Sequence, residues 1–143
     1  METGECLICN KHRGLQAQPP GGYVYEDPLW MVCHAPVRKG PLGTLFIESR
    51  RHILDFSEFS DEEAHTFGPL ARRVYAALRS LLGASRLYQV SLMEGVPHFH
   101  AWIVPRGPGV IERGVEFLAK DLTCTEPAAQ DLAARLRRAL LQS

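Results

Sequence analysis

The amino-acid sequence predicts an α+β domain that consists of an antiparallel sheet of about five strands, one long helix and a C-terminal helix. Short runs rich in aromatic and β-branched residues occur both before and after one long stretch of helical periodicity, and Gly and Pro residues separate them. The 143 residues, 45% of them hydrophobic, suffice for one core and are too few for two. We therefore expect residues 1–143 to form a single domain.

Three strands are expected in the first part of the chain. Residues 23–26 and 29–34 are rich in aromatic and β-branched side chains, and the turn signal Asp27-Pro28 between them predicts a hairpin. Residues 43–49 follow a loop rich in Gly and Pro and predict a third strand.

The long helix is predicted between a capping box that starts at Ser60 and a stop at Gly83. Pro69 lies inside it and is a point where a kink is expected, because proline removes one helical donor. Apolar residues recur at helical spacing through this stretch: Phe67, Leu70, Ala71, Val74, Leu78 and Leu81.

Two more strands and a terminal helix complete the prediction. Residues 87–93 and 98–104 are expected to pair antiparallel through a tight connection at residues 94–97. After a Gly-rich loop, residues 128–141 predict an amphipathic helix.

Charge and hydropathy argue against several classes of function. The 16 basic and 16 acidic residues cancel, so the chain lacks the overall positive field by which proteins bind nucleic acid or anionic membranes nonspecifically. No apolar stretch approaches the roughly 20 residues that cross a bilayer, and the start is acidic where a signal peptide would be basic. We expect a cytoplasmic protein with no nucleic-acid partner and no membrane partner.

The chain has four cysteines, which are too few and too unevenly spaced for a disulfide scaffold: Cys6, Cys9, Cys33 and Cys124. Cys6 and Cys9 have the spacing of one half of a zinc site, although a redox pair or two free thiols would share that spacing. A thioredoxin-like redox motif lies at a strand-to-helix junction, whereas these thiols precede a Gly- and Pro-rich loop. The sequence therefore favours a metal.

The predicted strand at 98–104 carries two histidines. Because side chains alternate along a strand, His98, His100 and Trp102 would share one face, and that face is the candidate site. The alternative is a pair of hydrogen-bonded, partly buried histidines with no chemical role. Three other histidines lack this context and are expected on the surface or in packing contacts: His12, His34 and His65.

This run resembles the signature of the histidine-triad family, in which alternating histidines on a strand end in an apolar pair and often Pro-Arg. Aligned on the segment 103–106, His98 takes the first place of the triad, His100 the middle and Trp102 the third. The resemblance is to the bacterial zinc-containing branch with its diadenosine polyphosphate hydrolases, and it spans residues 6–106, leaving 107–143 as a C-terminal loop and helix. Three further segments carry it: Cys6 with Cys9, Tyr25-Glu26-Asp27, and Arg50-Arg51-His52.

The resemblance implies a catalytic role for His100 as the nucleophile that attacks the α-phosphate of a nucleoside or dinucleoside polyphosphate and forms a nucleotidyl-histidine. It implies that the backbone carbonyl of His98 fixes the tautomer of His100. It also implies a homodimer and a structural zinc ion, whose ligands would be Cys6, Cys9, His52 and His98.

Four residues are expected to contact the substrate: His98, Trp102, Ser91 and Gly95. Gly95 would let phosphate oxygens approach backbone N–H groups, and Ser91 would offer a hydroxyl from the adjacent strand. Trp102 departs from the family, where the third place holds His or Gln, because an indole N–H donates but cannot shuttle a proton. We therefore expect substrates with good leaving groups, such as polyphosphate chains.

Three functions remain open from the sequence. The first is a nucleotide hydrolase or nucleotidyl transferase, which the retention of His100 favours. The second is a catalytically weak nucleotide-binding or sensor protein, because Trp102 replaces the third histidine; the third is a zinc-stabilised interaction module. Three apolar residues either form a pocket for the base or belong to the sheet core: Trp30, Leu45 and Ile47.

Overall fold

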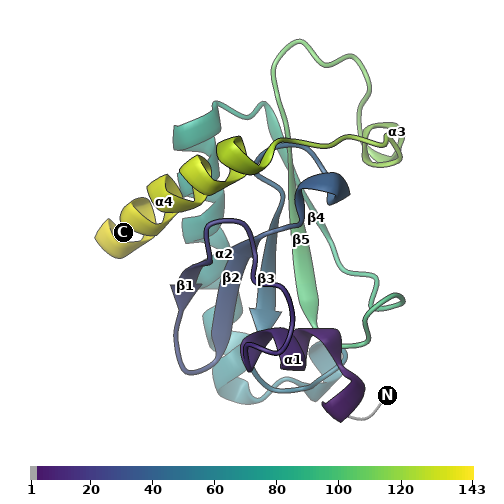
Figure 1. The fold of residues 1–143 in the computed structure, drawn as a ribbon, viewed down its shortest axis with the longest axis vertical. Coiled ribbons are helices and arrows are strands. Elements are labelled where there is room, and N and C mark those ends of the chain that lie inside the picture. Colours follow the sequence, from purple (N-terminus) through teal and green to yellow (C-terminus); the bar gives the residue numbers. More distant parts are fainter. Residues whose placement is uncertain (1–2) are drawn as a thin grey trace.

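The computed structural model describes residues 3–143 as one five-stranded antiparallel sheet with helices on both faces (Figure 1). The strands lie in the order β1-β2-β3-β5-β4 and comprise β1 (Tyr23–Glu26), β2 (Trp30–His34), β3 (Leu45–Ser49), β4 (Arg86–Val90) and β5 (His100–Arg106). The helices are α1 (Leu7–His12), α2 (Asp61–Leu82), α3 (Val115–Leu118) and α4 (Glu126–Gln142), with 3-10 turns η1 (Thr3–Glu5), η2 (Val37–Lys39) and η3 (Phe56–Glu58). The predicted α+β class is confirmed.

The first hairpin forms where the sequence predicts it. Oδ1 of Asp27 accepts hydrogen bonds from the backbone N–H groups of Leu29 and Trp30, each at 2.7 Å, and the hydroxyl of Tyr25 donates to Oδ2 at 2.6 Å. A side chain that bonds its own backbone two and three residues on closes a tight turn. Asp27 therefore sets the register with which β2 enters the sheet.

Helix α2 starts and ends at the predicted signals. The hydroxyl of Ser60 accepts from the N–H of Glu63 at 3.1 Å, and the Glu63 carboxylate accepts from the N–H of Ser60 at 2.8 Å. Gly83 ends the helix in the left-handed region at φ 62°. The helix remains continuous through Pro69.

The hydrophobic core lies between the sheet and the helices α2 and α4. Trp30, Leu45 and Ile47 are fully buried there against residues of both helices. Their interpretation as a pocket for a nucleotide base is therefore wrong, because they face the helices that cover the sheet. Among residues 3–143, no helix has the length and the apolar character that crossing a membrane requires.

The structure corrects several predicted boundaries. Strand β4 ends at Val90 and β5 begins at His100, so the segment expected to be a tight turn is a nine-residue loop, 91–99. The reason is tertiary: the N–H of Phe99 bonds the carbonyl of Ile53 at 2.6 Å instead of a strand partner. Strand β3 starts at 45, α4 starts two residues earlier than predicted, and the short helices α1 and α3 were not predicted.

Candidate functional site

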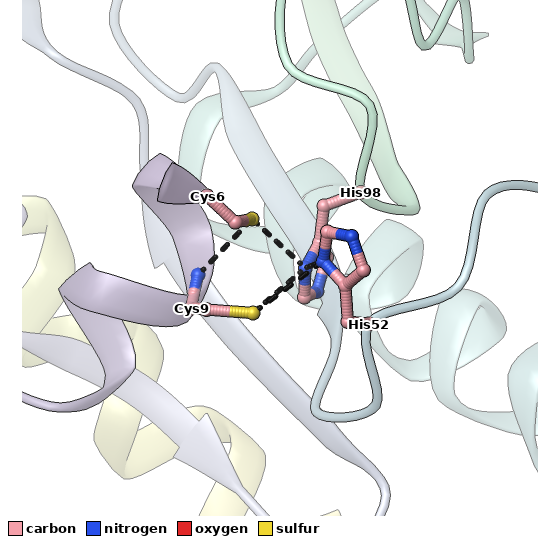
Figure 2. Close-up of side chains that lie close together, drawn as sticks. All are labelled: Cys6, Cys9, His52 and His98. Carbon is pink, nitrogen blue, oxygen red and sulfur yellow. Dashed lines mark hydrogen bonds between the residues drawn. The ribbon is translucent and has the colours of Figure 1, made fainter. Parts of the chain in front are cut away.

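Two cysteines and two histidines from three separate parts of the chain meet beside α1 (Figure 2). Cys6 caps the N-terminus of α1, where its sulfur accepts from the N–H of Cys9 at 3.4 Å. His52 follows the end of β3, and His98 precedes the start of β5. Their ligand atoms all lie within 4.8 Å of one another. The structure thus brings together the four residues for which the family resemblance implied a metal.

The distances within this cluster have the scale of a tetrahedral zinc site. His98 Nδ1 lies 3.3 Å from the Cys6 sulfur and 3.5 Å from the Cys9 sulfur, while the Nδ1 atoms of His52 and His98 lie 3.2 Å apart. Bonds of about 2.1 Å to nitrogen and about 2.3 Å to sulfur in a tetrahedron separate ligand atoms by about 3.3 to 3.8 Å. The Cys2His2 cluster is therefore compatible with zinc.

The protonation of His98 suits a metal ligand. Its Nε2–H donates to the backbone carbonyl of Ser49 at 2.7 Å, which leaves the lone pair of Nδ1 directed at the cysteine sulfurs. Burial lowers the pKa of His98 to about 4, so the ring is neutral at pH 7. Burial also raises the pKa of Cys9 to about 11, so metal binding would have to displace its proton.

His100 lies at the start of β5 with one ring nitrogen fixed. Its Nδ1 lies 2.7 Å from the backbone carbonyl oxygen of His98, and because a carbonyl only accepts, Nδ1 carries the proton. Nε2 is then the ring nitrogen left to offer a lone pair. The side chain is 9% exposed and borders a cavity, so this arrangement leaves a nucleophilic nitrogen available to a ligand.

The cavity beside His100 has a volume of about 720 Å³ and a mostly apolar lining. Phe46 and Trp102 form one wall with their rings edge to face, 4.7 Å between centroids. The loop 91–99 forms another, and Gly95 lies exposed in it at the cavity, whereas Ser91 is exposed and lies outside the lining. Size and lining are those of a small-molecule site.

The same loop contains a strained residue. Met93 lies at the cavity with φ 55°, a left-handed conformation that side chains other than Gly rarely adopt. Such strain is concentrated at ligand-binding and active sites.

Sequence reasoning missed a charged cluster next to the cavity, centred on Glu48. Glu48 is fully buried and accepts from Lys11 at 2.6 Å, from the ring of His12 at 2.9 Å and from the hydroxyl of Tyr23 at 3.0 Å. Burial alone would raise the pKa of Glu48, but the hydrogen bond from His12 and the charge of Lys11 outweigh it and lower the pKa. The sequence offered one sign of this cluster, because Glu48 is a charged residue inside the mostly apolar strand 45–49.

The remaining histidines divide between packing, surface and this cluster. His34 is buried, where its Nδ1–H donates to the carbonyl of Ala35 and its Nε2 accepts from the N–H of Gly43. His65 is exposed on α2. These two match the expectation, whereas His12 belongs to the charged cluster and its ring lies 5.9 Å from that of His98.

Several solved structures with a similar fold are described as histidine-triad proteins. A Zn-bound histidine triad family protein from Mycobacterium smegmatis is 20% identical, with a TM-score of 0.75 over 99% of this chain and 96% of that one. A hypothetical histidine triad nucleotide-binding protein from Sulfolobus tokodaii is 14% identical, with a TM-score of 0.75 over 96% and 93%. A Hit-like protein involved in cell-cycle regulation from Bartonella henselae, solved with an unknown ligand, is 14% identical, with a TM-score of 0.73 over 95% and 96%.

These comparisons establish the fold, and the resemblance found in the sequence is confirmed at that level. No protein-family model and no curated protein sequence matches the chain.

Proposed function

We propose that this histidine-triad-fold protein binds a nucleoside or dinucleoside polyphosphate in the His100 cavity and transfers its nucleotidyl group through a covalent bond to His100. One observation carries the proposal: the hydrogen bond from Nδ1 of His100 to the carbonyl of His98 fixes the tautomer that exposes Nε2 at the cavity. A neutral imidazole with one nitrogen held and the other free is a competent nucleophile toward phosphorus.

The reaction takes place in two displacements. Nε2 of His100 attacks the α-phosphorus, a P–N bond forms, and the P–O bond to the departing polyphosphate breaks with its electron pair on that oxygen. Water or another acceptor hydroxyl then attacks the same phosphorus, loses its proton to solvent, and displaces the ring, so that the electron pair of the P–N bond returns to Nε2. Throughout, the His98 carbonyl stabilises the positive charge that develops on the imidazole.

We propose zinc as the resident metal, held by Cys6, Cys9, His52 and His98. The separations of the four ligand atoms support this assignment, as does the Zn-bound neighbour of the same fold. The ion would supply a structural clip that ties α1 to the segment before β5, because a closed Cys2His2 set leaves no position for substrate. Through His98, the clip would hold the carbonyl that orients His100.

Trp102 limits the range of substrates in this proposal. Its ring lies 6.5 Å from that of His100. In this proposal its indole N–H donates to a phosphate oxygen, but the side chain has no proton to shuttle to a leaving group. Polyphosphate chains leave as stable anions and need no such proton. Backbone N–H groups near Gly95 are the proposed phosphate donors; Ser91 lies outside the cavity lining.

A second candidate function is nucleotide binding with little turnover, and the tryptophan in the third triad place favours it. For either function we propose a cytoplasmic homodimer without nucleic-acid or membrane partners, an assignment that rests on the family resemblance, composition and charge.

The test is hydrolysis of a dinucleoside polyphosphate, followed by chromatography of the products with wild type and with His100→Ala. An enzyme gives product with wild type only. A sensor gives binding by calorimetry and no product, and a protein that neither binds nor cleaves contradicts both functions.

A further inference from the structure

A second hollow, lined by three arginines, lies at the other end of β5 from His100. Its volume is about 540 Å³, and Arg86, Arg106 and Arg113 line it together with the loop 108–111. In Figure 1 this loop is the arch beyond the end of β5, on the opposite side of the molecule from α1. His100 and Arg106 are six positions apart on the strand, or about 20 Å.

The sheet itself forces two of these positive charges together. Arg86 on β4 and Arg106 on β5 are direct partners in the strand register. Like charges in directly opposed positions destabilise a sheet. Within the described part of the chain, no acidic residue lines the hollow, and the nearest acid along the loop, Glu112, is paired with Lys120 at 2.9 Å.

Arg106 is the unusual member because it is buried and forms no ion pair with any of residues 3–143. The residue is 4% exposed, its Nη1 donates to the carbonyl of Val110 at 3.4 Å, and its Nε is buried with no hydrogen-bond partner among these residues. A buried charge that lacks a partner costs free energy unless an anion balances it. The guanidinium is also a fork of donors that matches the oxygens of a phosphate or carboxylate.

The neighbouring side chain of Tyr88 is affected by the same positive charges. The N–H of Gly114 donates to the hydroxyl of Tyr88 at 2.8 Å. This hydrogen bond, with additional contributions from Arg106 and Arg86, lowers the pKa of Tyr88. The end of the β4–β5 pair is thus electropositive even though the whole chain has no net charge.

We propose that Arg86, Arg106 and Arg113 form a binding site for a small, multiply charged oxyanion of the phosphate class. The anion would accept from the guanidinium of Arg106, relieve the repulsion between Arg106 and Arg86, and contact Arg113, which also lines the hollow. This site is separate from the His100 cavity and does not rest on the proposed nucleotide chemistry.

The test is calorimetric titration of the full chain with inorganic pyrophosphate at low ionic strength, where exposed charges are least screened. The double variant Arg86→Gln/Arg113→Gln should bind at least about tenfold more weakly than wild type, since each loses a charge-assisted contact. Arg72→Gln, which removes an exposed arginine on α2, is the matched control and should bind as wild type. Equal affinity of the double variant, or no binding to wild type, overturns the proposal.

Thermal melting supplies an independent readout. Without the anion, Arg86→Gln should melt at or above the wild-type Tm because a like-charge pair is removed, while the rise in Tm on adding pyrophosphate should shrink. A lower Tm with an unchanged pyrophosphate-induced rise contradicts the site. Arg113 is exposed in the loop, so Arg113→Gln alone provides a folded variant that must also weaken binding.

Adenosine diphosphate as a second probe distinguishes the source of the phosphate. If the double variant loses affinity for both probes, the site takes the phosphates of a nucleotide. If only pyrophosphate binding falls, the site takes the free anion.

Discussion

Glu48 on β3 lies directly opposite His100 on β5, and both residues border the same cavity. Glu48 is fully buried and its carboxylate is held by Lys11 at 2.6 Å and by His12 at 2.9 Å, both on α1. The ion pair therefore attaches α1 to the strand next to the proposed nucleophile. It does so independently of the Cys2His2 cluster, which attaches α1 through its other end.

Removing the charge of Glu48 should destabilise the protein strongly. In Glu48→Gln the ammonium group of Lys11, itself 8% exposed, would remain buried without its partner, which costs about 3 to 5 kcal/mol. Urea denaturation measures this change. Glu62→Gln, on the exposed face of α2, is the control and should stay within about 0.5 kcal/mol of wild type.

The ion pair of Glu48 and Lys11 also predicts that the stability of the protein depends on pH. Because the pKa of Glu48 is lower in the folded than in the unfolded state, its stabilisation is present above the unfolded value of about 4.3 and is lost as the pH falls through the folded value. Melting temperatures between pH 7 and pH 3 should therefore fall more steeply for wild type than for Glu48→Gln. Parallel curves would mean that Glu48 does not titrate with folding.

The amount of bound metal should depend on the four residues of the Cys2His2 cluster. Protein purified without chelator is expected to hold one zinc ion per chain, and Cys6→Ser or His52→Ala should lower both metal content and Tm. A ligand present at a thousandfold excess over its Kd stabilises the folded state by about 4 kcal/mol, so the Tm shift should be large. Cys124→Ser, outside the cluster, is the control; unchanged metal in the ligand variants would refute the assignment.

Local signals in the sequence predicted the elements whose ends are fixed by contacts between residues close together in the chain. The capping box at Ser60 and the turn at Asp27 involve residues two or three positions apart. The hairpin and α2 could therefore be predicted from the sequence. The spacing of Cys6 and Cys9 predicted half of a metal site, whereas only the family resemblance added His52 and His98; the structure brings the four together.

Long-range contacts account for what the sequence did not predict. Helix α1 has six residues, too few to be stable alone, and its position depends on contacts between Lys11 and Glu48, 37 residues apart. The loop before β5 is held by the bond from Phe99 to Ile53, which no local pattern encodes. Glu48 itself was visible only as a charge within an apolar strand.

Trp102 is expected to limit the chemistry rather than nucleotide binding. Trp102→His should raise turnover more for substrates with poor leaving groups than for polyphosphates, because histidine can deliver a proton. Steady-state kinetics on one substrate of each kind measures the ratio. A loss of turnover on both would show that the tryptophan matters instead as the packing partner of Phe46.

The family resemblance predicts a homodimer. Light scattering across micromolar concentrations should give about twice the chain mass of 16.0 kDa. A mass equal to that of one chain at every concentration would reject the dimer, and the cavity residues would then have to act within a single chain.

The proposed catalysis requires a covalent bond between His100 and the nucleotide. His100→Ala should lose at least roughly 10³-fold in turnover while nucleotide binding changes little, as covalent catalysts do without their nucleophile. The most direct measurement is mass spectrometry of wild-type protein quenched with base soon after mixing with a dinucleoside polyphosphate. We expect an acid-labile, base-stable nucleotide adduct on the peptide that contains His100; a fully active His100→Ala protein would contradict covalent catalysis by this residue.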